Sequence, residues 1–97
     1  MEKYAIYTKW EWPNGVPSSE EMQAKHREVK KQTKSEDIIW WKCGDNHHQS
    51  VIIFSSEEEA QSELALRNKL REETIRDTGH KMVEETMGPV LSIMSQV

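Results

Sequence analysis

His26 is the residue of this chain best suited to carry a proton. It lies four residues after Met22 and three before Val29, a spacing that places all three side chains on one face of a helix. An imidazole gains and loses a proton near neutral pH, so His26 is the candidate catalytic residue, as a general base or a group that orients a substrate. The alternative is a structural histidine whose ring nitrogens are held by hydrogen bonds.

Large aromatic side chains are the second feature with a chemical use. Trp10, Trp40 and Phe54 are the candidate ligand-binding residues, because aromatic rings can wall a pocket for a small apolar or aromatic molecule. Tyr4 and Trp12 have the same character. Under the alternative interpretation, all these rings serve only the protein core and a dimer interface, where large aromatic residues are abundant.

A third group of residues invites comparison with a metal site. Cys43, Asp45, His47 and His48 surround one predicted turn, and thiolate, imidazole and carboxylate groups are zinc ligands. Their spacing matches no established site, and adjacent strand residues such as His47 and His48 point to opposite faces. Glycine, aspartate and asparagine favour solvated turns. We therefore predict a solvated turn here, with no metal and no cofactor.

The elements that position these residues follow from periodicity and from capping signals. Alternation of apolar and polar residues predicts strands, and the spacings Ser18-x-x-Glu21 and Ser56-x-x-Glu59 are capping boxes that mark two helix starts. In chain order we predict a strand over 4–12, a helix over 19–33, a β-hairpin over 37–55, a helix from 56 to Gly79, a strand over 80–87 ended by Gly88 and Pro89, and an apolar tail over 90–97 that forms a short helix or a strand.

The predicted hairpin is apolar on both sides. Residues 38–41 and 51–54 are two uninterrupted runs of β-branched or aromatic residues. Successive side chains of a strand point to opposite faces of the sheet, so both faces require cover. Helices joined by right-handed crossovers cover one face only. The simplest cover for the other face is a second copy of the same sheet, worth several kcal/mol at roughly 25 cal/mol per Å².

The predicted element order, βαββαβ, is that of a ferredoxin-like α+β fold, in which a four-stranded antiparallel sheet carries two helices on one face. Together with the two-sided hairpin, this layout makes the chain resemble the dimeric α+β barrel superfamily, which includes the antibiotic-biosynthesis monooxygenase-like proteins. The resemblance covers residues 1–97 as a single domain and is one of layout, not of a sequence motif. It implies a small pocket between the sheet and the helices, where some members hold aromatic substrates or haem.

Two residue sets of the superfamily can be compared with this chain. Its cofactor-free monooxygenases pair Asn with Trp, Tyr or Arg in the pocket, and its haem-degrading members use Asn, Trp and a helix His. This chain has Tyr7 and Trp10 on its first predicted strand but no Asn there, and its second predicted helix contains no His. The chain therefore departs from both sets, and His26 on the first predicted helix is the residue that would substitute.

Composition narrows the classes of partner. A net charge of −4 gives no basic surface for nucleic acid, and residues 48–54 lack the glycines and paired aromatics of an RNA-recognition domain. The longest apolar runs, of four residues, fall far short of the roughly 20 residues that span a membrane. A single cysteine, and an N-terminus without the layout of a signal peptide, favour the cytoplasm.

We predict a cytoplasmic homodimer that joins through a sheet face and binds a small apolar or aromatic molecule near His26. Its candidate reactions are a cofactor-free oxidation, as in the monooxygenase-like proteins, and an isomerisation. The alternative is a non-catalytic structural or regulatory module whose aromatic residues serve the dimer and a partner protein.

Overall fold

The computed structural model describes residues 2–63, 68–69, 72 and 79–97. Its elements follow one another as β1 (Tyr4–Glu11), α1 (Ser19–Lys30), β2 (Asp37–Gly44), β3 (His47–Phe54), α2 (Glu57–Ser62), β4 (Lys81–Pro89) and a short 3-10 helix, η1 (Met94–Gln96). The predicted α+β class is confirmed. Most of the second predicted helix beyond Ser62 lies outside the described residues.

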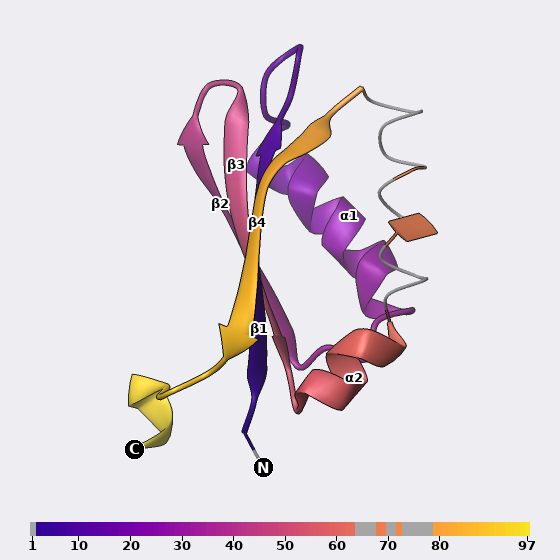
Figure 1. Cartoon of the computed structure of the whole chain (residues 1–97). Helices are drawn as coiled ribbons and strands as arrows, with labels where there is room; N and C mark the ends of the chain where they lie inside the picture. The colour runs from indigo at the N-terminus through magenta and orange to yellow at the C-terminus, as the bar shows by residue number, and fades with distance from the viewer. Residues whose placement is uncertain (1, 64–67, 70–71, 73–78) are drawn as a thin grey trace.

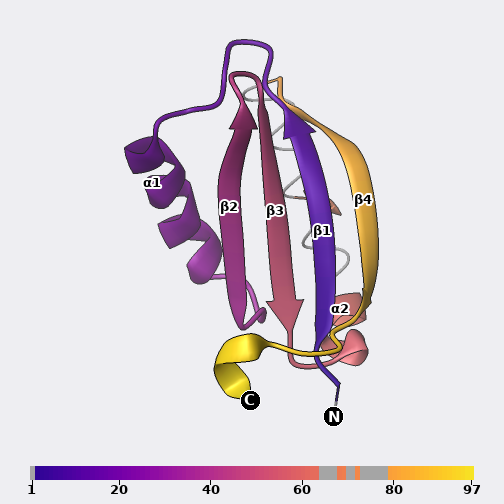
Figure 2. The same ribbon diagram turned by 90° about the vertical axis from the view of Figure 1, so that its left-hand side faces the viewer.

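Four strands form one antiparallel sheet in the order β2-β3-β1-β4. Figure 1 shows the sheet edge-on with α1 and α2 on the same side, and we call the sheet face on that side the inner face. The opposite, outer face is turned toward the viewer in Figure 2. This arrangement is compatible with a ferredoxin-like layout. The sheet is open, so the predicted barrel is not present in the single chain.

Alternation along the central strands decides which side chains reach the inner face. On β1, Tyr4, Ile6 and Thr8 are buried, whereas the residues between them are only half-buried. On β3, Ser50 lies opposite Thr8 and Phe54 lies opposite Tyr4, so these buried residues share that face. The predicted strand period is thus confirmed for the two strands at the centre of the sheet.

The hydrophobic core lies under α2, at one end of the inner face. Tyr4, Ile6, Phe54 and Ala60 form a single cluster, and Ile52 packs against it. Both predicted helix starts are confirmed by side-chain caps on the backbone N–H three residues later. The cap at the start of α2 turns the chain directly after β3, and the first turn of the helix therefore brings Ala60 onto the core.

Glu63 fastens the loop between α1 and β2. Its side chain is buried, and its carboxylate accepts hydrogen bonds from the backbone N–H of Lys34 and from the Thr33 hydroxyl, the latter at 3.0 Å. α1 ends at Lys30, three residues before the predicted end at Thr33, although the backbone N–H of Thr33 still donates to the Val29 carbonyl at 3.0 Å.

Removal of this carboxylate should destabilise the fold. Glu63→Ala leaves the Lys34 N–H without its acceptor and removes one of the two hydroxyl partners of Thr33, which also binds the Ser35 hydroxyl at 2.8 Å. An unsatisfied buried group costs about 1–3 kcal/mol. We expect the free energy of unfolding to fall by about 2 kcal/mol in urea titrations followed by tryptophan fluorescence. Glu63→Gln, which keeps one acceptor oxygen, should lose about half as much. A loss no greater than that of the exposed control Glu58→Ala would show that Glu63 does not fasten the loop.

The last strand runs two residues further than predicted. Gly88 and Pro89 do not end β4 but pair with the start of β1. Proline is tolerated there because β4 is an edge strand, where a missing N–H faces no partner strand. One further hydrogen bond follows β4, from the Val90 N–H to the Lys3 carbonyl at 2.8 Å. The tail then leaves the sheet and forms η1.

Candidate functional site

Aromatic and imidazole rings gather on the inner face at the end of the sheet opposite the hydrophobic core. We call this group the tryptophan–histidine cluster. Its members are Trp10 of β1, Trp12 just after β1, His26 of α1, Trp40 of β2, His48 of β3 and His80 just before β4. Five segments of the chain therefore meet in one place.

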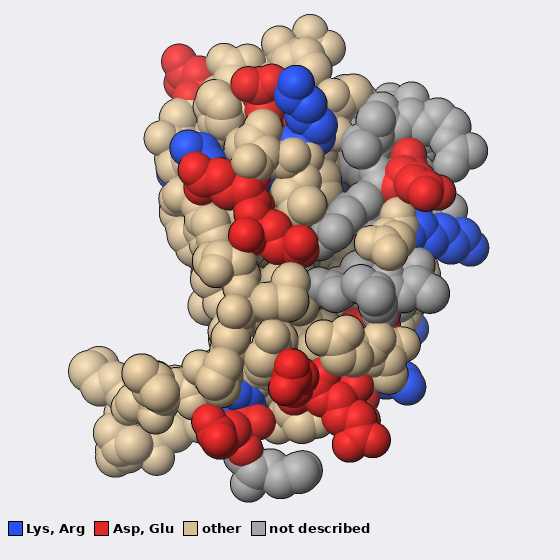
Figure 3. All heavy atoms as spheres, viewed as in Figure 1, with Lys and Arg blue, Asp and Glu red and all other residues tan. Residues whose placement is uncertain are grey.

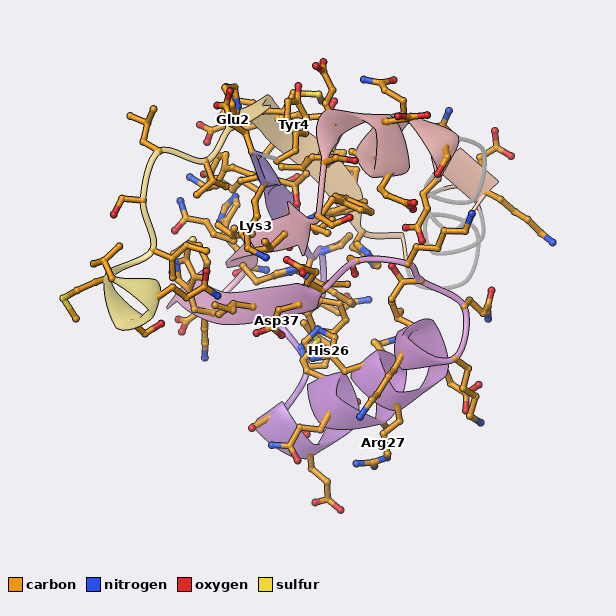
Figure 4. All side chains as sticks on the ribbon, turned by 90° about the horizontal axis from the view of Figure 1, so that it is seen from below. Glu2, Lys3, Tyr4, His26, Arg27 and Asp37 are labelled. Carbon is orange, nitrogen blue, oxygen red and sulfur yellow. The ribbon has the colours of Figure 1, made fainter. Side chains whose placement is uncertain are left out.

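His26 lies over Trp40. The two ring centroids are 3.5 Å apart and the ring planes differ by 21°. Figure 4 shows His26 pointing from α1 toward the sheet, whereas the next residue, Arg27, points away from it. His26 therefore faces the sheet, as its place on the apolar helix face with Met22 and Val29 predicts. No residue of α1 is fully buried.

His48 occupies the centre of the cluster. Its ring centroid lies 6.3 Å from Trp10, 5.8 Å from Trp12 and 5.9 Å from Trp40. The indole Nε1 of Trp12 donates a hydrogen bond of 2.7 Å to Nδ1 of His48. Since an indole N–H can only donate, Nδ1 of His48 must be unprotonated, and the neutral ring carries its proton on Nε2.

The hairpin turn holds Trp12 in this position. The backbone N–H of Trp12 donates to the carbonyl of Asn46 at 2.7 Å, and the Asn46 side-chain amide donates to the carbonyl of Trp12 at 2.7 Å. A third bond, from the Val16 N–H to the Asp45 carbonyl, continues the same contact. The turn between β2 and β3 thus fixes the loop after β1, and with it the indole that binds His48.

His80 closes the cluster on the side of β4. Its ring stacks on Trp12 with centroids 3.8 Å apart and planes 17° apart, and meets Trp10 edge-on at 4.9 Å. His80 is 6% exposed and His48 is 4% exposed, so both imidazoles are withdrawn from water. The amine of Lys25 lies 5.9 Å from the centre of the Trp12 ring and places a positive charge at the rim.

The surroundings favour the neutral form of all three histidines. Desolvation, together with a smaller effect of the neighbouring His26, lowers the pKa of His48 from 6.5 to about 4. Desolvation likewise lowers the pKa of His80 to about 3, with contributions from His48 and Lys25. The pKa of His26 is also lowered by desolvation, an effect that Asp37 opposes. At pH 7 the cluster is therefore a set of uncharged rings.

One nitrogen of the cluster is left over. Among the described residues, Nε2 of His26 is the buried side-chain atom without a hydrogen-bond partner. Buried polar groups are nearly always paired, so each exception needs a reason. A neutral imidazole nitrogen donates or accepts one hydrogen bond, according to the tautomer. A hydroxyl, carbonyl or N–H group close to this atom and beside the ring of Trp40 would satisfy it.

The structure brings together three of the four predicted site residues. His26, Trp40 and Trp10 belong to one cluster, in which His48 links the two indoles. Phe54 lies six residues beyond His48 along β3, about 20 Å away at 3.3 Å per residue. It packs in the hydrophobic core beneath α2.

Sequence reasoning missed His48 and His80 as members of the site. The turn is solvated as predicted, with Cys43 and Asp45 exposed, but His48 is buried behind it. A usable signal existed: His48 is in phase with Phe54 on β3, so alternation places it on the same face as this predicted ligand-binding residue. His80 carries no such signal, because it precedes its strand. Within the residues that the structure describes, no group of three or more His, Cys, Asp or Glu side chains is arranged to hold a metal ion.

The outer face carries a chain of hydrogen bonds that crosses all four strands. Trp41 Nε1 donates to Gln49 Oε1 at 2.7 Å, Gln49 Nε2 donates to the Tyr7 hydroxyl at 2.8 Å, and that hydroxyl donates to Glu84 Oε2 at 2.9 Å. Desolvation, and then the bond to Glu84, raises the pKa of Tyr7. Ile39, beside this chain, is 54% exposed, so in the single chain the predicted cover of this face is missing.

The sequence matches no protein-family model, and a search of curated proteins returns no match. Among the described helices, none is both long enough and apolar enough to cross a membrane. What the protein does is therefore inferred from its own residues.

Proposed function

We propose that the protein binds a small aromatic molecule at the tryptophan–histidine cluster, with Nε2 of His26 as the polar contact. One observation carries this proposal: Nε2 of His26 is buried, has no hydrogen-bond partner among the described residues, and belongs to a ring stacked on Trp40. A flat molecule with one hydroxyl, carbonyl or N–H group would satisfy it while packing against the indoles. Trp10 and Trp40 supply the apolar wall, and Phe54 supports the sheet from the core.

A neutral His26 also provides a base. Asp37 raises the pKa of His26 against the effect of desolvation, so its carboxylate would stabilise the imidazolium that forms when His26 accepts a proton. Asp37 is the first residue of β2, and Figure 4 shows it beside His26. Removal of a phenolic or enolic proton leaves an electron-rich carbon. Reaction of that carbon with molecular oxygen gives an oxidation, and its reprotonation at another position gives an isomerisation.

We further propose that two copies associate through their outer faces and together form a dimeric α+β barrel. Ile39 and Trp41 are 54% and 39% exposed on this face, beside the half-buried Val51 and Ile53. A stable interface buries about 800 Å² per partner, which is an area that one face of a small sheet can supply. A cytoplasmic location remains our expectation from the sequence.

A second candidate function is that of a non-catalytic structural or regulatory module that binds another protein. The exposed outer face favours it, because a contiguous apolar surface on a small domain commonly marks an interaction site. The two candidates differ in what they require of His26: the ligand-binding function depends on its free nitrogen, and the interaction module does not.

Calorimetric titration with 1-naphthol and with naphthalene separates these functions. The two probes have the same rings, but only 1-naphthol has a hydroxyl group for Nε2 of His26. We expect wild-type protein to bind 1-naphthol about tenfold more tightly than naphthalene, as one hydrogen bond worth about 1.4 kcal/mol requires. In His26→Phe, which keeps a ring over Trp40, this preference should disappear.

The matched control is His47→Phe. His47 precedes His48 in the chain but is not part of the cluster, and its Nε2 lies 3.5 Å from a carboxylate oxygen of Glu11. This variant should keep the wild-type preference for 1-naphthol. Equal affinity of wild type and His26→Phe for 1-naphthol would remove His26 from the site. Failure of both probes to bind would favour the interaction module.

A further inference from the structure

The C-terminal segment 90–97 places apolar side chains in solvent. Leu91, Met94 and Val97 are 97%, 87% and 95% exposed. The segment contains no charged residue, and Figure 3 shows it as an uncharged projection at the lower left of the molecule. Single exposed apolar residues are common on protein surfaces, but three on one projecting segment mark a surface that gains from being covered.

This segment stands on the outer side of the sheet. In Figure 1 it projects away from α1 and α2, and in Figure 2 it lies in front of the lower end of the strands. Its root is fixed, because the Val90 N–H binds the Lys3 carbonyl at 2.8 Å. Beyond this bond the tail extends away from its own chain, as the exposure of Leu91 shows.

A shallow depression of about 220 Å³ lies on the outer face next to that root. Its apolar lining comes from Ala5, Val51, Met87 and Pro89. Gly88 opens the depression, since a Cβ atom added at this glycine would meet nothing within 4 Å. The space suits a side chain of the size of Leu or Met, the kind of side chain that the tail exposes.

We propose that segment 90–97 of one copy docks in the Gly88 depression of a second copy, and that the exchange is reciprocal. This inference rests on the proposed homodimer and identifies the tail and the depression as contacts between its two copies. Pro89 lines the depression and Val90 begins the tail, so the two features are adjacent on every chain. A two-fold axis close to both brings each tail to the partner's depression and closes the assembly at two copies.

The tail is long enough for this exchange. Its eight residues span about 26 Å when extended, at about 3.3 Å per residue. No charged residue lines the depression, and the nearby carboxylate of Glu84 is hydrogen-bonded by the hydroxyl of Tyr7, which does line it, at 2.9 Å. The uncharged tail therefore meets no isolated buried charge there.

Sedimentation equilibrium of the full chain and two variants tests the exchange. Leu91→Asp/Met94→Asp places charges on exposed side chains of the tail, and Gly88→Leu fills the depression. We expect each to raise the dimer dissociation constant at least tenfold. The matched control is Gly44→Leu, at the other glycine where an added Cβ meets nothing within 4 Å, and it should leave the constant unchanged. Circular dichroism verifies that all variants keep the fold.

The outcomes separate this inference from the rest of the proposed function. The exchange would be overturned if the tail variant and Gly88→Leu both keep the dimer dissociation constant of wild type while Ile39→Asp loses the dimer. That result would leave a dimer through the outer face without tail exchange. A wild-type protein that stays monomeric would overturn both. Ligand binding at His26 is measured by its own titration and is unaffected by either result.

A disulfide trap identifies the occupant directly. One chain carries Cys43→Ser and Thr86→Cys, and a second, separately purified chain carries Cys43→Ser and Met94→Cys. We expect oxidation of the mixture to yield a covalent dimer of the two different chains. Covalent dimers formed only between identical chains would contradict the exchange. A third chain carries Cys43→Ser and both new cysteines, and an internal disulfide in it, without a covalent dimer, would also contradict the exchange.

Discussion

Lowering the pH from 7 to 5 should reduce the free energy of unfolding by about 3 kcal/mol, chiefly through His48 and His80. Both are buried and neutral in the folded protein, with pKa values of about 4 and about 3. In the unfolded chain each has the ordinary pKa of 6.5. A histidine that protonates only after unfolding lowers the free energy of unfolding by up to about 1.9 kcal/mol between pH 7 and pH 5. Partial solvent screening makes the combined effect of the two histidines smaller than twice this value.

The sign follows from proton uptake. Between pH 6.5 and the lowered folded pKa, the unfolded chain binds more protons than the folded chain, so stability rises with pH in this window. The stabilisation is fully present above pH 6.5 and is lost as the pH falls toward 4 for His48 and toward 3 for His80. The hydrogen bond from Trp12 acts in the same direction, because protonation of Nδ1 would remove its acceptor.

Urea unfolding at pH 7, 6 and 5 measures this effect above the range in which most carboxylates titrate. His48→Asn keeps an acceptor near the Trp12 indole and removes the titration, so it should flatten the dependence by about half. A free energy of unfolding that is constant between pH 7 and 5 would mean that the cluster histidines are not held neutral.

Truncation of Phe54 to alanine should lower the free energy of unfolding by about 4 kcal/mol. Phe54 is fully buried, and it packs with Tyr4, Ile6 and Ala60 in the core that joins the sheet to α2. Loss of the ring removes its transfer free energy and leaves a cavity, which together cost about 3–5 kcal/mol in other proteins. This is a large part of the roughly 5–15 kcal/mol expected for a domain.

Two controls define this result. Phe54→Leu should cost about 1.5 kcal/mol because it keeps most of the volume, and Val83→Ala, at an exposed position of β4, should cost less than 1 kcal/mol. Phe54→Leu should also leave the affinity for 1-naphthol unchanged, since Phe54 lies in the core and not in the tryptophan–histidine cluster. An affinity loss as large as that of His26→Phe would place Phe54 in the ligand site.

Local patterns of the sequence predict much of the fold. The capping serines at 18 and 56, the alternation of β1 and the turn residues between β2 and β3 each act over a few residues, and each is confirmed. The errors lie where distant residues override a local signal. Pairing with β1 carries β4 through Gly88 and Pro89. The loop after α1 is bound by Glu63, a residue about 30 positions further along the chain.

The candidate site divides in the same way. The helical spacing of His26 with Met22 and Val29 predicts that it faces the sheet. The strand period places Trp10 on one face with Tyr4 and Ile6, but it does not say which face meets the helices; the structure places Trp10 and Trp40 on the inner face. Which rings meet was not predictable, because it depends on cross-strand register: Trp10 lies opposite His48 only in the observed pairing of β1 with β3. Membership of His80 depends on where the chain enters β4, which a sequence period does not encode.

The ¹⁵N NMR spectrum of the histidine side chains, recorded at pH 7 with and without 1-naphthol, tests the proposed site most directly. We predict neutral rings for His26, His48 and His80, an unprotonated Nδ1 in His48, and a change in the Nε2 resonance of His26 when 1-naphthol is added. Charged cluster histidines at pH 7, or a spectrum in which 1-naphthol leaves His26 unchanged, would contradict the proposed ligand site.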